Sequence, residues 1–199
     1  MSRTQGTGPG FLSQLFKDIV NPQVSWQEIL RQYIQEKARN DYSWAEPNRR
    51  YVHAGIYLPA LSSNELGALI VAVDTSGSVS DLKIAEFLGH IQEIVALNPV
   101  KVYLIFCDES IRIPVIEWEP ANGPLEFPSR FPRGGTDHRP VFAWVETNII
   151  EAPCCMICLT DLYTSFPREA PTYPVLWAVT GPGIDDVILP FGEAINVDG

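Results

Sequence analysis

One short turn concentrates oxygen-bearing side chains in a pattern that suggests metal chemistry. In the stretch VAVDTSGSVSD, residues 71–81, an apolar run ends at Asp74, and Ser76 and Ser78 follow at every second position. On a tight turn that leaves a strand, alternate side chains point the same way, so these three side chains can face one point. Gly77 lets the backbone turn between the two serines.

Two later loops add oxygen ligands of the same kind. The loop GGTDHRP carries Thr136, and LTD, directly after CCMIC, ends in Asp161. Because sites in an open parallel sheet form beyond the carboxyl ends of the strands, we expect these residues to meet Asp74, Ser76 and Ser78. Two carboxylates and three hydroxyls suit Mg²⁺, Mn²⁺ or Ca²⁺ and not a soft metal. Five protein oxygens of which only two carry a charge leave such an ion with open coordination positions, which can take a further carboxylate from outside, and this predicts a docking site.

The elements that must position these residues begin at about Gly67. The apolar runs GALIVAVD, VKVYLIFCD, CCMICLTD and YPVLWAVTG predict buried strands, and DDVILPF predicts a last short one. Residues 110–118 alternate and predict a more exposed antiparallel strand. SDLKIAEFLGHIQEIVALN predicts a helix with Ser80 as N-cap, and the GGTDHRP loop leads into another helix. The order predicts an α/β domain over 67–199: a doubly wound, mainly parallel sheet with helices on both faces and GALIVAV in its middle.

Residues 1–66 predict a short helical and extended N-terminal arm. One amphipathic helix is expected at about 11–19 and a second from Ser25 through WQEILRQYIQEKA. In the second helix one stripe is expected to be buried, formed by Trp26, Ile29, Leu30, Tyr33 and Ile34. The aromatic and Arg-rich stretch over 41–60 has no period, and we expect it to wrap over the main domain.

Composition and charge exclude several classes of function. The formal net charge of −10, with no basic run, argues against a nucleic-acid duplex as partner. No run reaches membrane-spanning length and the N-terminus lacks the apolar core of a signal peptide, which predicts a cytoplasmic protein without a membrane partner. Three of the four cysteines, Cys154, Cys155 and Cys158, sit in an apolar run. We expect them to be buried, reduced and free of zinc, as in a reducing compartment.

Other interpretations of VDTSGS have less support. An aspartic protease needs two facing Asp-Thr-Gly-like turns, and the chain has one. An aspartyl-phosphate phosphatase needs a D-x-D pair, which is lacking. A nucleophilic Ser76 needs a His base, for which only His138 is near in sequence, and His138 with Arg139 is expected to be an exposed loop pair. For any single residue, simple capping of a helix or turn remains open, Asp161 included.

The order D-x-S-x-S, Thr136 and Asp161 after successive strands resembles the metal-ion-dependent adhesion site of von Willebrand factor A (VWA) domains. The resemblance covers about 67–199 and implies a binding module that grips an acidic residue of a partner protein through Mg²⁺, or Mn²⁺ or Ca²⁺. Because bacterial intracellular members of the family work beside MoxR-type AAA+ ATPases, it also implies such a partner.

The upstream stretch is similar to a narrower group. VSWQEILRQYIQ, DYSWAEPNRR and GIYLP resemble the segment that links a metallopeptidase-like region to a VWA-like domain in bacterial and phage proteins. The alternative function that this implies is the C-terminal part of a metal-dependent hydrolase. The chain contains no H-E-x-x-H, and His53, His90 and His138 are isolated, so we expect no enzyme activity from this chain alone.

Overall fold

A computed structural model describes residues 25–39, 42–47, 59–61, 67–150 and 152–198. Its main feature is a six-stranded sheet with the order β5-β4-β3-β6-β7-β8, in which only β5 is antiparallel to its neighbour. The strands are β3 (Leu69–Asp74), β4 (Val102–Cys107), β5 (Ile116–Trp118), β6 (Cys155–Thr160), β7 (Val175–Val179) and β8 (Glu193–Asn196). The predicted α/β fold with a mainly parallel sheet and a central GALIVAV strand is confirmed.

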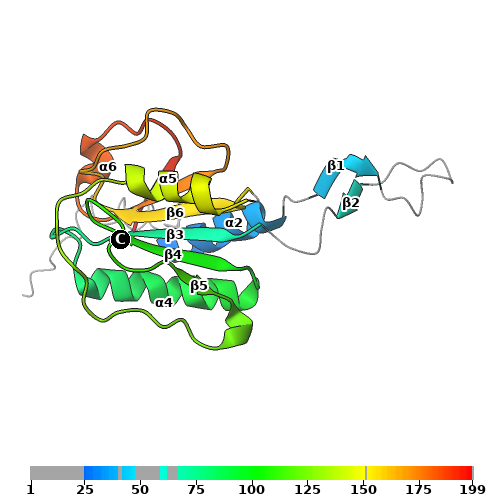
Figure 1. Ribbon diagram of the computed structural model, residues 1–199, viewed down its shortest axis with the longest axis horizontal. Helices are drawn as coiled ribbons and strands as arrows, with labels where there is room; N and C mark the ends of the chain where they lie inside the picture. The colour runs from blue at the N-terminus through cyan, green and yellow to red at the C-terminus, as the bar shows by residue number, and fades with distance from the viewer. Residues whose placement is uncertain (1–24, 40–41, 48–58, 62–66, 151, 199) are drawn as a thin grey trace, which may run out of the picture.

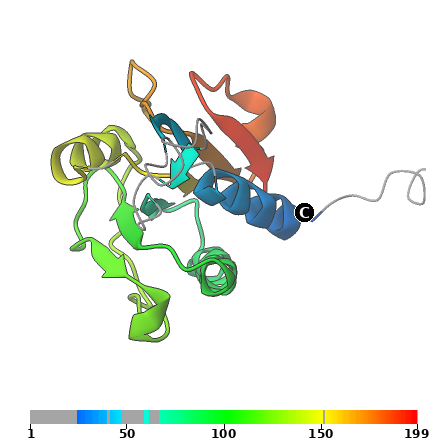
Figure 2. The same ribbon diagram turned by 90° about the vertical axis from the view of Figure 1, so that its right-hand side faces the viewer.

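Helices cover both faces of this sheet. Figure 1 shows α4 (Asp81–Leu97) below the sheet, and α5 (Arg139–Asn148) and α6 (Gly183–Asp186) above it. The helix α2 (Trp26–Arg39) lies on the same side as α4, as Figure 2 shows. The remaining elements are the 3-10 helix η1 (Pro120–Asn122) and a separate antiparallel pair, β1 (Tyr42–Pro47) and β2 (Pro59–Leu61).

The strand β3 shows why a continuous apolar run is needed at the centre. All six of its residues are buried, and successive side chains enter opposite cores. Val71 and Val73 pack with α2 and α4, whereas Ile70 and Ala72 pack with α5. The helix α4 follows as predicted: Ser80 accepts a hydrogen bond from the Lys83 N–H at 3.2 Å. Its expected apolar stripe is buried in full, namely Ile84, Phe87, Leu88, Ile91, Ile94 and Val95.

The helix α2 belongs to the core of the six-stranded sheet. Leu30 and Ile34 are fully buried in the same cluster as β3, α4 and β6, and Ser25 accepts a hydrogen bond from the Glu28 N–H at 3.4 Å. The prediction that Ile29 is buried is wrong. Its side chain is exposed, because the face of α2 that packs against the sheet is narrower than the apolar face of the helix. The helix predicted at 11–19 and most of the arm over 41–60 lie outside the described residues.

Two strand predictions need correction. The antiparallel strand predicted over 110–118 shortens to β5, because only Ile116–Trp118 pair with β4. The last strand is not DDVILPF. Asp185 and Asp186 instead close α6, and Pro190, which cannot donate to a ladder, precedes the positive φ of Gly192. The strand that completes the sheet is β8, which is exposed at both ends, only partly buried at Ala194 and Ile195, and carries no long apolar run.

The cysteine thiols give a first testable prediction. Cys107, Cys155 and Cys158 are buried. Burial raises the pKa of Cys107 to about 12, the hydrogen bond with Cys154 and burial raise that of Cys155, and burial raises that of Cys158. Because the thiolate is the reactive form, these three should not react with a disulfide reagent at pH 8 in the native state, while all four thiols react in denaturant. Fast native reaction of two or more thiols would contradict this packing.

Candidate metal centre

Asp74 and Asp161 meet at one edge of the sheet, as predicted. Asp74 is the last residue of β3, and Asp161 follows the last residue of β6. The two strands are parallel and Val73 pairs with Leu159, so both aspartates lie at the carboxyl end. Both side chains are inside the protein: Asp74 is 0% exposed and Asp161 is 7% exposed. Parallel pairing of adjacent strands is therefore what brings residues 87 positions apart to the same end.

The Asp74 carboxylate is held by two donors. Its Oδ1 accepts a hydrogen bond from the Ser76 N–H at 2.8 Å, and its Oδ2 accepts one from the Thr160 hydroxyl at 3.0 Å. Thr160 in turn accepts a hydrogen bond from the Leu162 N–H at 3.1 Å. These contacts fix the orientation of Asp74 and leave its remaining lone pairs available, because a carboxylate offers about four acceptor positions.

The two serines of the turn converge as predicted. The Ser76 and Ser78 Oγ atoms lie 3.0 Å apart, with Ser76 buried and Ser78 exposed. Helix capping does not explain them, because the capping hydroxyl of α4 is that of Ser80. Asp161 does cap a turn, as the simpler interpretation allowed: its Oδ1 accepts the Tyr163 N–H at 3.0 Å. The serine pair therefore presents one buried and one exposed hydroxyl that the helix does not require.

The turn after Asp161 is strained and tightly packed. Leu162 has a φ of 67°, a left-handed conformation that is uncommon for a residue with a side chain. Gly183, at the start of α6, touches this turn so closely that a Cβ on it would lie 1.9 Å from the Asp161 carbonyl oxygen. The position of Asp161 therefore depends on a glycine in a different element.

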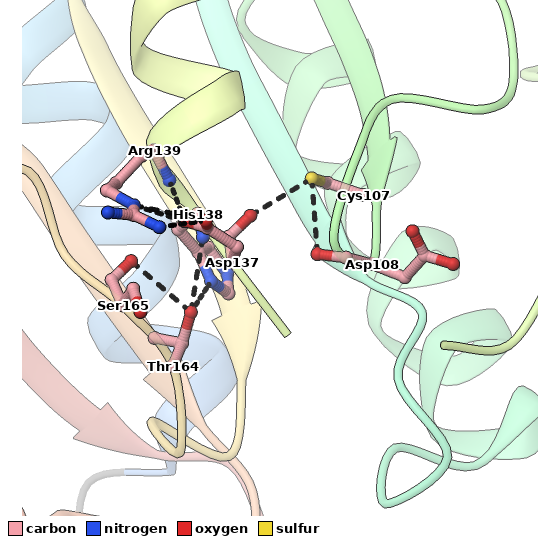
Figure 3. Close-up of polar contacts among 7 residues, drawn as sticks. All are labelled: Cys107, Asp108, Asp137, His138, Arg139, Thr164 and Ser165. Atoms are coloured by element: carbon pink, nitrogen blue, oxygen red, sulfur yellow. Dashed lines mark hydrogen bonds and ion pairs between the residues drawn. The ribbon is translucent and has the colours of Figure 1, made fainter. Parts of the chain in front are cut away.

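Thr136 lies on a loop that is docked against the same edge. The Asp137 N–H donates to the Asp108 carbonyl at 2.8 Å, and the Cys107 thiol lies 3.3 Å from the Asp137 carbonyl (Figure 3). Cys107 pairs with Asp74 across the β3–β4 ladder. Thr136 is half-buried, and among the described residues its hydroxyl has no hydrogen-bond partner. The structure thus brings the Thr136 loop to the candidate centre without joining its hydroxyl to the other four side chains.

His138 is buried, which corrects the expected exposed loop pair with Arg139. The Nδ1 atom of its ring lies 2.8 Å from the Thr164 hydroxyl, and its backbone N–H donates to the Ser165 carbonyl (Figure 3). Burial lowers the pKa of His138, and the nearby carboxylates, Asp74 first among them, only partly oppose this effect. Arg139 is exposed and pairs with Asp137, which lowers the pKa of that carboxyl. The ring is covered by Thr164 and by Trp177, whose ring packs edge-on against it at 5.8 Å between the centroids.

The donor set and its charges fit a hard divalent cation. Asp108, buried at the end of β4, is paired with Arg112 at 3.1 Å. Asp74 and Asp161 have no ion-pair partner among the described residues, and a buried carboxylate without a counter-charge is costly. Within the described part of the chain no three His, Cys, Asp or Glu side chains are grouped to hold a metal, so serine and threonine hydroxyls must complete any site. Hydroxyl and carboxylate oxygens are ligands that Mg²⁺, Mn²⁺ and Ca²⁺ accept.

Three residues of this edge were not predicted. Asp108 follows a buried strand in the same way as Asp74 and Asp161, and this shared position could have identified it. Thr160 precedes Asp161 and reads as an ordinary strand end, so its bond to Asp74 had no signal of its own. Arg133 contacts the Ser76 carbonyl at 2.6 Å across 57 positions of sequence, which no local pattern reports.

Comparison with known proteins gives two family matches. Residues 69–198 match the family model described as "VWA-like domain (DUF2201)", and residues 1–62 match the model described as "Putative metallopeptidase domain". An uncharacterized protein of Thermotoga maritima is 27% identical over 104 residues, which cover 51% of this chain and 25% of that relative. No solved structure matches the chain. No helix in the described ranges is long and apolar enough to cross a membrane.

Proposed function

Since the chain belongs to the family of VWA-like domains (DUF2201), which it matches over residues 69–198, we propose that it is a divalent-cation-dependent protein-binding module. The proposed ligand set is Asp74, Ser76, Ser78, Thr136 and Asp161, and the proposed ion is Mg²⁺, with Mn²⁺ or Ca²⁺ as substitutes. When bound, the ion supplies a positive centre with an open position for a carboxylate of a partner protein.

One observation carries this proposal: Asp74 is fully buried without a cationic partner among the described residues, beside two converging serine hydroxyls. A purely structural aspartate would be expected to cap and face solvent, or to pair with Lys or Arg. Asp74 instead accepts two hydrogen bonds, from the Ser76 N–H and the Thr160 hydroxyl, that hold its carboxylate in one orientation. These features support a preformed, negatively charged cation-binding site at Asp74 and the two serines.

Each residue has a distinct part in this proposal. Ser76 and Ser78 offer hydroxyl oxygens directly, with Ser78 on the solvent side. Asp74, held by the Ser76 N–H and the Thr160 hydroxyl, supplies charge from beneath and acts through water. Thr136 and Asp161 flank the turn, and one of Thr136 and the two aspartates provides the third direct contact. The two formal negative charges of the set balance those of a divalent ion, so an open coordination position, and not an excess of charge, is what would accept an outside carboxylate.

The test of the proposal is metal binding by the serine pair. Calorimetric titration of the chain with Mn²⁺ and Mg²⁺ should give one saturable site per chain, of weak affinity. Replacing both hydroxyls, in Ser76→Ala/Ser78→Ala, should weaken Mn²⁺ binding by about 10- to 100-fold. Ser80→Ala, which removes only the cap of α4, is the matched control and should bind Mn²⁺ as the wild type does while costing about 1 kcal/mol of stability. Equal heats from wild type and the double variant would refute the cation site.

The partner is proposed from chemistry and from the resemblance to VWA domains. The ligand is an exposed Asp or Glu of another protein, and a MoxR-type AAA+ ATPase is the proposed co-worker, in the cytoplasm. Glutarate serves as the probe for the carboxylate position: on the Mn²⁺-loaded chain it should displace a metal-bound water, seen as lower water proton relaxivity. Propanediol, which has no carboxylate, is the control and should leave the relaxivity unchanged.

The alternative function has its own observation, the match of residues 1–62 to the metallopeptidase model. In that case the VWA-like domain is a part of a metal-dependent hydrolase. Incubation of the chain with Zn²⁺ and a denatured protein substrate tests it. Cleavage that a chelator stops, and that Asp74→Asn leaves intact, would favour the hydrolase, whereas the binding module predicts no cleavage.

A further inference from the structure

Arg133 makes three contacts across the candidate centre. Its guanidinium donates hydrogen bonds to the Ser76 carbonyl at 2.6 Å and to the Val79 carbonyl, and it forms an ion pair with Asp81. Ser76 belongs to the serine pair, Val79 follows Ser78 directly, and Asp81 is the first residue of α4. One side chain from the Thr136 loop therefore contacts the segment from Ser76 to Asp81, which runs from the serine pair to the start of α4.

The other end of the same loop is anchored independently. The Asp137 N–H donates to the Asp108 carbonyl at 2.8 Å, and the Cys107 thiol lies 3.3 Å from the Asp137 carbonyl. Thr136 thus lies within a span of five residues, with an anchor on the β3 side at Arg133 and an anchor on the β4 side at Asp137.

The residues between the anchors leave little room for other conformations. A Cβ on Gly134 would lie 2.7 Å from the Asp108 Oδ2 atom, which is buried and held beside Arg112. A Cβ on Gly135 would meet the Glu109 side chain, which is exposed and able to move. The loop therefore passes directly over the end of β4, and Gly134 is the position that permits this approach.

We propose that Arg133 is a positioning residue that holds the Thr136 hydroxyl in place beside the Asp74–Ser78 turn. This inference rests on the proposed cation site. The contacts of Arg133 suit the task, because a planar guanidinium can serve two carbonyls and a carboxylate at once in fixed geometry. Arg133 forms its ion pair with Asp81 and not with Asp74 or Asp161, so the negative charges of those two aspartates remain available to a cation.

A double-mutant cycle tests whether Arg133 acts through Thr136. The variants are Arg133→Ala, Thr136→Val, which removes the hydroxyl at nearly constant shape, and the two combined; the readout is Mn²⁺ affinity. Arg133→Ala should weaken binding about tenfold. The same change in the Thr136→Val background should have less than about a twofold effect, because the hydroxyl that it positions is already gone.

Asp81→Asn is the matched control, since it removes the ion pair and leaves both carbonyl contacts in place; it should alter affinity less than about twofold. Arg133→Gln keeps a neutral hydrogen-bond donor, so its Mn²⁺ affinity should lie between that of wild type and that of Arg133→Ala. It replaces the alanine variant in the cycle if that variant does not fold. Additive losses in the cycle, or unchanged binding in Arg133→Ala, would overturn this inference alone. Absence of Mn²⁺ binding by the wild type would overturn the proposed function, and the inference with it.

Discussion

Asp74→Asn is expected to abolish divalent-cation binding and at the same time to raise the melting temperature of the metal-free protein. The carboxylate is fully buried without a counter-charge among the described residues, so its charge costs stability when no cation is present. Asparagine keeps an oxygen for the Ser76 N–H, and the Thr160 hydroxyl can rotate to accept from the amide. A gain of about 1 kcal/mol corresponds to a rise of about 2–4 °C for a chain of this size.

Asp74→Ala is the less informative change, because Asp74 has structural partners. Alanine leaves the Thr160 hydroxyl and the Ser76 N–H unpaired in the interior, at about 1–3 kcal/mol each. Removal of this side chain would cost little stability only if Asp74 had no hydrogen-bond partners, and the structure gives it two. Asparagine separates loss of charge from loss of hydrogen bonds, which alanine does not.

Thermal unfolding with and without Mg²⁺ measures both effects of Asp74→Asn. Wild type should gain stability with the ion, by about 2.7 kcal/mol at 100 times its Kd, and Asp74→Asn should gain none. Asp185→Asn is the charge-matched control: it removes one exposed carboxylate and should leave the Mg²⁺-dependent gain as in wild type. If metal-free Asp74→Asn is less stable than metal-free wild type, the buried charge of Asp74 does not lower stability. If Mg²⁺ stabilises Asp74→Asn as much as wild type, Asp74 is not part of the cation site.

Gly183→Ala is expected to be the most damaging single methyl addition in the described chain near the candidate centre. The added Cβ would lie 1.9 Å from the Asp161 carbonyl oxygen and 3.3 Å from the Leu162 Cβ, so either α6 or the Asp161 turn must move. Overpacking of this kind costs about 1–3 kcal/mol, and a displaced Asp161 should weaken Mn²⁺ binding about tenfold. Chemical denaturation and Mn²⁺ titration measure the two losses separately.

Gly89→Ala provides the matched control for this experiment. Gly89 is exposed within α4, and a Cβ there meets nothing within 4 Å. Alanine should therefore stabilise the helix, by up to about 1 kcal/mol, without effect on Mn²⁺ affinity. If Gly183→Ala is as stable as wild type and binds Mn²⁺ equally, the close approach of α6 to Asp161 does not position the aspartate.

The parts of the fold that could be predicted depend on local signals. A run buried on both faces has to be apolar throughout, which identified β3, and Ser80 followed by a helical period identified α4. The turn from Asp74 to Ser78 was predictable for the same reason, since its geometry is set within five residues. The strand β8 was missed because an edge strand that is half exposed needs no apolar run.

The remainder of the candidate centre depends on contacts between distant residues. His138 is buried because Thr164, 26 positions later, meets its ring, and a polar loop sequence gives no indication of that. The support from Thr160 to Asp74 and from Arg133 to Ser76 crosses 86 and 57 positions. Resemblance to a known site identifies candidate ligands by their order in the sequence, but the residues that support those ligands come from distant elements and are seen only in the packed structure.

The position of α2 bears on how this protein architecture is inherited. Leu30 and Ile34 are embedded between α4 and the sheet, yet their residues fall within the stretch that matches the metallopeptidase model. A recombination event that joined a new upstream module at the start of the VWA match would remove the helix that shields β6 and β8. A VWA-like domain cut at residue 69 is therefore expected to expose apolar surface of β6, and the unit that can be moved or expressed with its core intact begins at Trp26.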